Sequence, residues 1–252
     1  MPSMIAESLA GKRIAITGST GFVGTALVER LLRGVPDCEL ILLIRDSTRT
    51  KAAVRTQKEL LKNDAFDRLR EQYGAPDSPE SFAEMTARRI TTIAGDVSRD
   101  GLGLNDADRA TFATAEVVIH SAATVSFDSP LDRAIEINLL GPVRIARLCH
   151  ELGITPHVVA VSTCYVAGNR RGNAPEELVS AGPFDIGLSW QAEVDAARRL
   201  KGDTEALSRL PERLAQFRND ARDELGAAGA PALAAKTEQL RGRWVKDQLV
   251  EA

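Results

Sequence analysis

The sequence predicts an α/β fold in which a doubly wound parallel sheet precedes a C-terminal helical segment. Short apolar runs alternate with helix-like segments through the first two-thirds of the chain, which is the order of βαβ units. The run 40–44 is apolar at every position, as expected of a strand covered on both faces. From Trp190 onward the sequence is rich in Ala, Arg, Glu and Leu, which favours helices.

The individual elements follow from local spacing. Short apolar or β-branched runs predict strands at residues 13–17, 40–44, 90–94, 117–119 and 158–161. Helical spacing predicts helices around 26–32, within 51–88 with an interruption near 74–76, and over 131–152. An apolar stripe at three- and four-residue steps then lines one helix face, formed by Leu207, Leu210, Leu214, Phe217 and Ala221. Pro211 is expected at a helix start, and Gly226, Gly229 and Pro231 are expected to precede a last helix.

Composition excludes several classes of function. The chain has 252 residues, of which 44% are hydrophobic and 27% charged, with a formal net charge of −3. It lacks the basic excess of most nucleic-acid binders. No apolar run approaches the roughly 18 residues of a membrane-spanning helix, and residues 1–10 do not have the pattern of a secretory signal. Cys38, Cys149 and Cys164 lie far apart, which argues against a disulfide scaffold or a zinc site. We therefore expect a cytoplasmic protein without a metal or a nucleic-acid partner.

A glycine-rich turn follows the first expected strand. The first glycine, Gly18, permits a sharp turn, Gly21 lets the backbone approach a pyrophosphate, and Gly24 lets the next helix pack against the strand. The start of that helix presents free N–H groups and the positive end of its dipole. The strand before the turn and the helix after it predict a Rossmann-type dinucleotide site. Its expected contacts are Gly18, Ser19, Thr20, Gly21, Phe22, Val23 and Gly24.

The residues after the second strand favour NADPH over NADH. An NAD site usually carries an acidic residue at this position, whereas Ile44 is followed here by Arg45. A guanidinium can bind the 2′-phosphate of NADPH through two charge-assisted hydrogen bonds, and Arg55 could be a second ligand. Asp46 could instead turn toward a 2′-hydroxyl, which would favour NADH.

Small and polar residues follow the third and fourth strands. Asp96 and Val97 are expected near the adenine, and Ser121, Ala122 and Ala123 would let the cofactor lie against the backbone. His120 could be a residue at the edge of the core. These positions complete the cofactor wall that the residues themselves predict.

Three further motifs carry a resemblance to a known family. They are residues 119–128 (IHSAATVSFD), 137–141 (INLLG) and 161–166 (VSTCYV). With the spacing of the glycine turn, they resemble the fatty acyl-CoA reductase family, the "male sterility" NAD-binding domain akin to thioester reductase domains, over residues 12–168. The resemblance implies an extended short-chain dehydrogenase/reductase fold. It also implies NADPH-dependent reduction of a fatty acyl-CoA, or of an acyl-carrier thioester, to an aldehyde or alcohol.

The resemblance also implies roles for single residues. Thr163 matches the family's catalytic Ser/Thr, with Ser162 beside it at the cofactor, and Asn138 steadies the region after the fourth strand. The family's general acid is a tyrosine with a lysine four residues later. Tyr73 and Tyr165 both lack that lysine, because they are followed by Asp77 and Asn169.

Two hypotheses follow from the missing pair. We expect residues 1–188 to form an NADP-binding domain, and residues 189–252 a helical insertion that ends before the Tyr-x-x-x-Lys helix. The chain is then either the cofactor-binding part of a longer reductase or a catalytically incomplete nucleotide-binding module. Association with a membrane surface would suit lipid substrates, but no segment of the sequence supports it.

Overall fold

The computed structural model describes residues 4–75, 77–126, 128–163, 171–178, 187–227 and 229–251. The chain divides into two compact units. The first, the sheet unit, comprises Met1–Ala123 and Glu136–Thr163; the second, the helical unit, comprises Thr124–Ile135 and Cys164–Ala252. The boundary expected between residues 188 and 189 stays a prediction, and the packing groups the short segment Thr124–Ile135 with the later helices.

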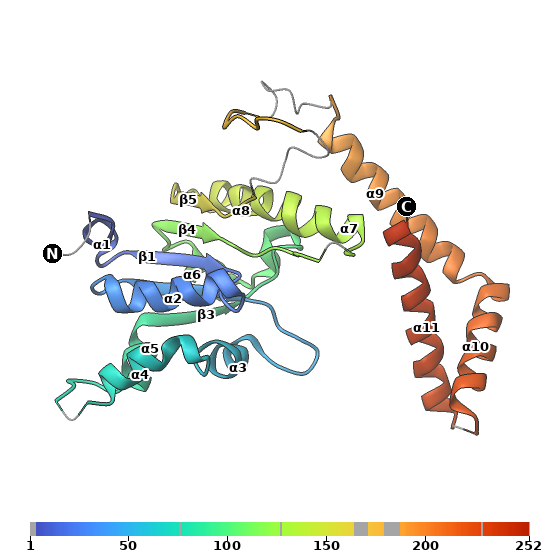
Figure 1. Cartoon of the computed structure of the whole chain (residues 1–252), viewed down its shortest axis with the longest axis horizontal. Coiled ribbons are helices and arrows are strands. Elements are labelled where there is room, and N and C mark those ends of the chain that lie inside the picture. Colours follow the sequence, from blue (N-terminus) through green and yellow to red (C-terminus); the bar gives the residue numbers. More distant parts are fainter. Residues whose placement is uncertain are drawn as a thin grey trace. The chain divides into compact units, whose positions relative to one another are not determined.

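Among the residues that the structure describes, the sheet unit contains five parallel strands in the order β3-β2-β1-β4-β5. Figure 1 labels β1, β3, β4 and β5. They are β1 (Arg13–Thr17), β2 (Glu39–Ile44), β3 (Ile90–Ala94), β4 (Val117–His120) and β5 (His157–Ala160). The predicted strands are confirmed to within one residue at each end. Chain order runs outward from β1 to β3 and then reverses to β4 and β5, so the switch point of the sheet lies between β1 and β4.

Helices connect the strands of this unit. They are α1 (Met4–Leu9), α2 (Phe22–Gly34), α3 (Ala52–Arg55), η1 (Thr56–Leu60), η2 (Asp64–Phe66), α4 (Asp67–Tyr73), α5 (Phe82–Arg89), η3 (Asp100–Gly103), α6 (Asp106–Phe112) and α8 (Leu140–Glu151). The single helix predicted over 131–152 is wrong in one respect. The structure divides it into α7 (Leu131–Ala134), the π-helical η4 (Ile135–Leu139) and α8. Pro142 lies in the first turn of α8, where it has no N–H to donate within the helix.

Both faces of the central strands are buried. Ile14, Ile16 and Leu42 pack on one face with residues of α2, η2 and α5, such as Val28, Phe66 and Met85. Their neighbours Ala15, Ile41 and Leu43 pack on the other face with Phe112, Ile145 and Leu148. This alternation accounts for the continuous apolar run of β2 and confirms the doubly wound architecture. All four residues of β5, at one edge of the sheet, are exposed.

The helical unit contains α9 (Trp190–Ser208), α10 (Pro211–Leu225) and α11 (Ala230–Glu251), and α7 packs against α9 and α11. The helix start expected at Pro211 is confirmed. The prediction that the apolar stripe lines one helix face is wrong, because Leu207 lies on α9 and the stripe crosses the turn into α10. The buried guanidinium of Arg241 joins α11 to α9 through Glu205, at 2.7 Å, and Ser208, at 2.8 Å. Among the described residues, none of the helices combines the length and the apolar character that crossing a membrane would require.

Candidate functional site

The predicted cofactor residues lie beyond the carboxyl ends of the strands, along one side of the sheet. In a parallel sheet the carboxyl ends of all strands lie at the same edge, where open α/β sheets bind ligands. The glycine turn follows β1, Arg45 follows β2, Asp96 follows β3, Ser121 follows β4 and Ser162 follows β5. Segments far apart in sequence are thereby brought to a common edge (Figure 1).

The glycine turn is built without room for side chains. Gly18 has a φ of +76°, and a Cβ added there would lie 2.6 Å from the amide nitrogen of Ala122. Gly24 lies in the first turn of α2, and a Cβ added there would lie 2.1 Å from the carbonyl oxygen of Gly18. These approaches bring the β1 and β4 ends together at the switch point. They leave only backbone in the position where a dinucleotide pyrophosphate would lie.

The start of α2 offers hydrogen-bond donors. Its first N–H groups have no acceptor within the helix, and Gly21 at the N-cap provides no side-chain cap. Within the part of the chain that the structure describes, the buried Ser19 hydroxyl has no hydrogen-bond partner. A buried hydroxyl left unpaired costs on the order of 1–3 kcal/mol, so an anionic oxygen at this turn would be favourable. Phe22 and Val23 are exposed and Thr20 is half-buried. The turn fits a dinucleotide phosphate group.

Two arginines meet at the end of β2. The Arg45 side chain is 57% exposed, and its Nη1 lies 3.9 Å from Asp96 Oδ2. Arg55 Nη1 donates to the carbonyl oxygen of Arg45 at 2.7 Å, while its remaining donors face the Glu59 carboxylate. The hydrogen bonds that Arg55 donates to the Glu59 carboxylate raise the pKa of Arg55. Arg55 therefore holds the backbone that carries Arg45.

Asp46 is engaged elsewhere. Its Oδ1 accepts the Ala52 amide at the start of α3 at 2.8 Å, and its Oδ2 accepts Lys51 Nζ at 2.7 Å. The hydrogen bond from Lys51 is the main reason that the pKa of Asp46 is lowered. Both carboxylate oxygens thus stabilise the loop before α3, so the acidic side chain beside Arg45 is held by its own chain.

The loop after β3 is tied to itself and to α8. Asp96 Oδ1 accepts the Ser98 amide at 2.9 Å and the Ser98 hydroxyl at 2.7 Å. Val97 is buried, and its carbonyl oxygen accepts Arg144 Nη1 at 3.4 Å. The expected adenine wall is therefore an ordered turn.

A buried polar pair lies below the β1 and β4 ends. Thr17 Oγ1 is 2.7 Å from His120 Nδ1 and accepts the Ala122 amide at 3.3 Å. Ser121 Oγ donates to the Thr17 carbonyl oxygen at 2.8 Å. Burial lowers the pKa of His120, which keeps the ring neutral. His120 is a core residue, and the sequence interpretation missed Thr17, whose only signal is its position as the last residue of β1.

The remaining predicted residues lie on the surface. Ser162 and Thr163 follow β5 and are exposed, as are Ala123 and Asn138, the latter within η4. Cys164 and Tyr165 fall outside the described residues. No group of three or more His, Cys, Asp or Glu side chains in the described ranges is arranged to bind a metal.

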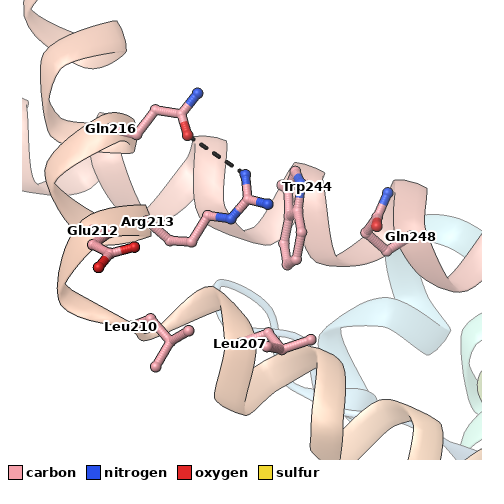
Figure 2. A pocket seen from close by; sticks show the side chains of 7 residues that line it. All are labelled: Leu207, Leu210, Glu212, Arg213, Gln216, Trp244 and Gln248. Atoms are coloured by element: carbon pink, nitrogen blue, oxygen red, sulfur yellow. Dashed lines mark hydrogen bonds between the residues drawn. The ribbon is translucent and has the colours of Figure 1, made fainter.

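The helical unit has a groove of its own, with a volume of about 470 Å³ (Figure 2). Its lining residues come from α9, α10, α11 and the turn between the first two: Leu207, Leu210, Glu212, Arg213, Gln216, Trp244 and Gln248. The Arg213 guanidinium lies over the Trp244 ring, 5.1 Å from its centroid. None of the predicted site residues lines this groove.

Comparison with known proteins identifies the family. Residues 16–224 match the family model of the NAD-binding domain of the male sterility protein. The chain belongs to this family. It is 33% identical over 188 residues to the chloroplastic fatty acyl-CoA reductase 2 of Arabidopsis thaliana, covering 73% of this chain and 28% of that protein. It is 31% identical over 200 residues to fatty acyl-CoA reductase 1 of the same plant, covering 77% and 39%.

A solved structure supports the same assignment. The terminal R domain of the myxalamid PKS-NRPS pathway is 26% identical, with a TM-score of 0.51, over 81% of this chain and 47% of that one. The resemblance drawn from the motifs is thus confirmed, as is the Rossmann-type fold followed by helices. The chain spans about a third of the length of these two curated relatives.

Proposed function

We propose that this chain is the NADPH-binding part of a reductase that converts a fatty acyl thioester, on CoA or a carrier protein, to an aldehyde or alcohol. The observation that carries the proposal is the glycine turn at the switch point, where Gly18 and Gly24 leave no space for a Cβ. Family membership and the two named plant relatives support the thioester as substrate. When bound, the nicotinamide supplies the hydride for the carbonyl.

In this proposal the sheet edge binds and orients the coenzyme. The turn around Gly18–Gly24 and the α2 N-terminus hold the pyrophosphate through backbone N–H groups. Ser19 Oγ donates to a phosphate oxygen, which pairs a hydroxyl that is otherwise unpaired among the described residues. Asp96 and Val97 face the adenine, and small residues after β4 let the ring systems lie against the backbone.

Arg45 is the proposed ligand of the 2′-phosphate. Its exposed guanidinium is held only loosely by Asp96, and Arg55 fixes its main chain through the carbonyl oxygen. Asp46 already accepts hydrogen bonds from the Ala52 amide and from Lys51, which holds its carboxylate toward its own chain and favours NADPH over NADH. Arg55 adds positive charge near the 2′-phosphate, but its guanidinium donors are already bonded to the Glu59 carboxylate.

Thr163 is the proposed catalytic hydroxyl. Hydride attack builds negative charge on the thioester carbonyl oxygen, and a hydroxyl donor beside it stabilises that charge. Thr163 follows β5 at the same sheet edge as the other predicted residues, with Ser162 beside it and Asn138 on η4 as a further contact. We also propose a cytoplasmic location, since both described cysteines are free thiols.

Coenzyme preference tests the proposal directly. Arg45→Gln removes a charged donor, so the Kd for NADPH should rise by roughly 10- to 150-fold, as expected for a charge-assisted hydrogen bond of about 1.5–3 kcal/mol. The Kd for NADH should stay unchanged. Isothermal titration calorimetry measures both. Arg13→Gln is the matched control, because Arg13 also pairs with one carboxylate, Glu39 at 2.9 Å, but at the amino end of β1. An unchanged ratio of the two Kd values in Arg45→Gln would refute the NADPH assignment.

A second candidate is a nucleotide-binding module without turnover. The sequence contains no Tyr-x-x-x-Lys, and the absence of a general acid alone typically lowers a rate by about 10²–10⁴-fold. Both candidates bind NADPH, and neither predicts normal turnover by this chain alone, so turnover by a longer protein that contains this chain distinguishes them. NADPH oxidation with palmitoyl-CoA by that protein at a rate normal for an enzyme would exclude the binding module.

A further inference from the structure

Arg144 is a charged residue buried among apolar ones. It lies on α8, whose neighbouring residues Ile145 and Leu148 pack into the core of the sheet unit. Its side chain is only 7% exposed. A buried charge is costly unless every donor is paired, so the partners of this guanidinium show what its burial achieves.

Those partners lie on two separate segments. Nε donates to Asp100 Oδ1 at 3.0 Å, and Nη1 donates to the carbonyl oxygens of Glu136, at 2.8 Å, and Val97, at 3.4 Å. Nη2 bonds to the Glu136 carboxylate. Val97 lies in the loop after β3 and Asp100 begins η3, whereas Glu136 belongs to η4. One planar group therefore joins two stretches of main chain that are separated by β4.

Both stretches carry proposed cofactor contacts. Asp96 immediately precedes the bonded carbonyl of Val97, and Asn138 is two residues beyond Glu136 in a π turn. Arg144 Nη1 donates to the carbonyl oxygen of Glu136 inside this turn at 2.8 Å, so it helps to fix the backbone two residues before Asn138.

We propose that Arg144 is a positioning residue for the coenzyme: it sets the separation between the loop at Asp96–Val97 and the η4 turn at Asn138. The inference rests on the proposed coenzyme site. It acts through the guanidinium fork, which reaches both segments at once. A lysine at this position retains the charge but, as a single ammonium on a flexible stem, cannot serve both segments in the same plane.

Arg89 is a natural control for a merely structural role. It is equally buried, and it donates to the carbonyl oxygens of Leu32 at 2.7 Å, Val35 at 2.7 Å and Cys38 at 2.9 Å. It immediately precedes β3 and so lies at the amino end of that strand, away from the predicted residues. Loss of its fork should lower stability without changing coenzyme affinity.

The test compares Arg144→Lys with Arg89→Lys in the full chain. Urea unfolding measures stability, and calorimetry at a temperature where near-ultraviolet circular dichroism shows both variants folded measures the Kd values. We expect both variants to be less stable, but only Arg144→Lys to raise the Kd, by about 3- to 30-fold. The rise should be equal for NADPH and NADH, because the variant disturbs the residues that face the adenine and not those that bind the 2′-phosphate. In Arg45→Gln, by contrast, only the Kd for NADPH should rise.

Glu136→Gln keeps the experiment decisive if Arg144→Lys does not fold. It removes one charge partner but leaves both carbonyl bonds, so a smaller rise in both Kd values is expected. An unchanged Kd in the folded variant, or an equal rise in Arg89→Lys, would overturn the positioning role alone. Failure of the unsubstituted chain to bind either coenzyme would overturn the proposed function and this inference with it.

Discussion

Alanine substitutions at Gly18, Gly24 and Gly153 separate the two constraints on the glycine turn, which are a left-handed φ and the close approach of backbone atoms. Gly24→Ala places a Cβ 2.1 Å from the carbonyl oxygen of Gly18, so it tests the close approach of the backbones. Gly18→Ala adds a left-handed φ of +76° to a contact of 2.6 Å with the Ala122 amide. Gly153→Ala, with a φ of +67° and no atom within 4 Å, tests the φ penalty alone.

The expected losses follow from these geometries. A left-handed φ costs a non-glycine residue about 1–2 kcal/mol, which is the whole effect expected for Gly153→Ala. Forcing extra volume into a packed site costs about 1–3 kcal/mol, which is the effect expected for Gly24→Ala. Gly18→Ala combines both, so its free energy of unfolding should fall by about 2–5 kcal/mol. Both neighbours are main-chain atoms that cannot rotate away.

Urea unfolding and NADPH calorimetry together provide the assay. The two turn variants should lose NADPH affinity, since the displaced carbonyl of Gly18 or the moved Ala122 amide changes the phosphate cradle. Gly153→Ala should lose stability only, because it follows α8 and precedes the amino end of β5. A Gly24→Ala protein as stable as the wild type, with the same Kd, would show that the turn does not have the packing on which the coenzyme site depends.

Two further predictions concern buried polar groups. Ser19→Ala removes a hydroxyl that is unpaired among the described residues, so urea unfolding should show that the unliganded variant is no less stable than the wild type. The Kd for NADPH should rise by about 2- to 12-fold. A less stable variant with the same Kd would contradict this prediction. Burial lowers the pKa of His120, so below about pH 6.5 the unfolded state binds a proton more readily than the folded state does. The free energy of unfolding should therefore fall as the pH drops below about 6.5, by at most about 1.4 kcal/mol per pH unit. Urea unfolding at pH 7 and pH 5.5 should show a smaller loss in His120→Asn, and equal losses would exclude His120 as the source.

The strands were predictable because their physics is local. A run such as β2 is buried on both faces, and complete burial leaves a continuous apolar signal in the sequence. The glycine turn was equally visible, since each glycine meets a constraint that only glycine satisfies. The division of the helix over 131–152 was not predicted, because a π turn of five residues changes the apolar spacing of the segment too little to be recognised in the sequence.

The polar network of the site depends on partners distant in sequence. Thr17 and His120 are paired by the register of β1 with β4, which the sequence does not specify. Arg144 did leave a signal, since a charged residue stands beside Ile145 on a helix face that is otherwise apolar. Such a residue indicates a buried guanidinium that needs hydrogen-bond acceptors, but its acceptors at Val97 and Glu136 are known only from the folded structure.

Arg45 and Asp46 show why adjacent charges need a structure to assign them. Either could face the ribose, and they would select opposite coenzymes. On the proposed function the Ala52 amide favours Arg45, because α3 starts at Ala52 and takes the Asp46 carboxylate as its acceptor. A change at position 46 therefore acts on the start of α3, whereas the guanidinium of Arg45 stays exposed beside Asp96. On the proposed function, coenzyme preference should follow the charge at position 45, and Asp46→Asn should lower stability while leaving the NADPH-to-NADH ratio unchanged.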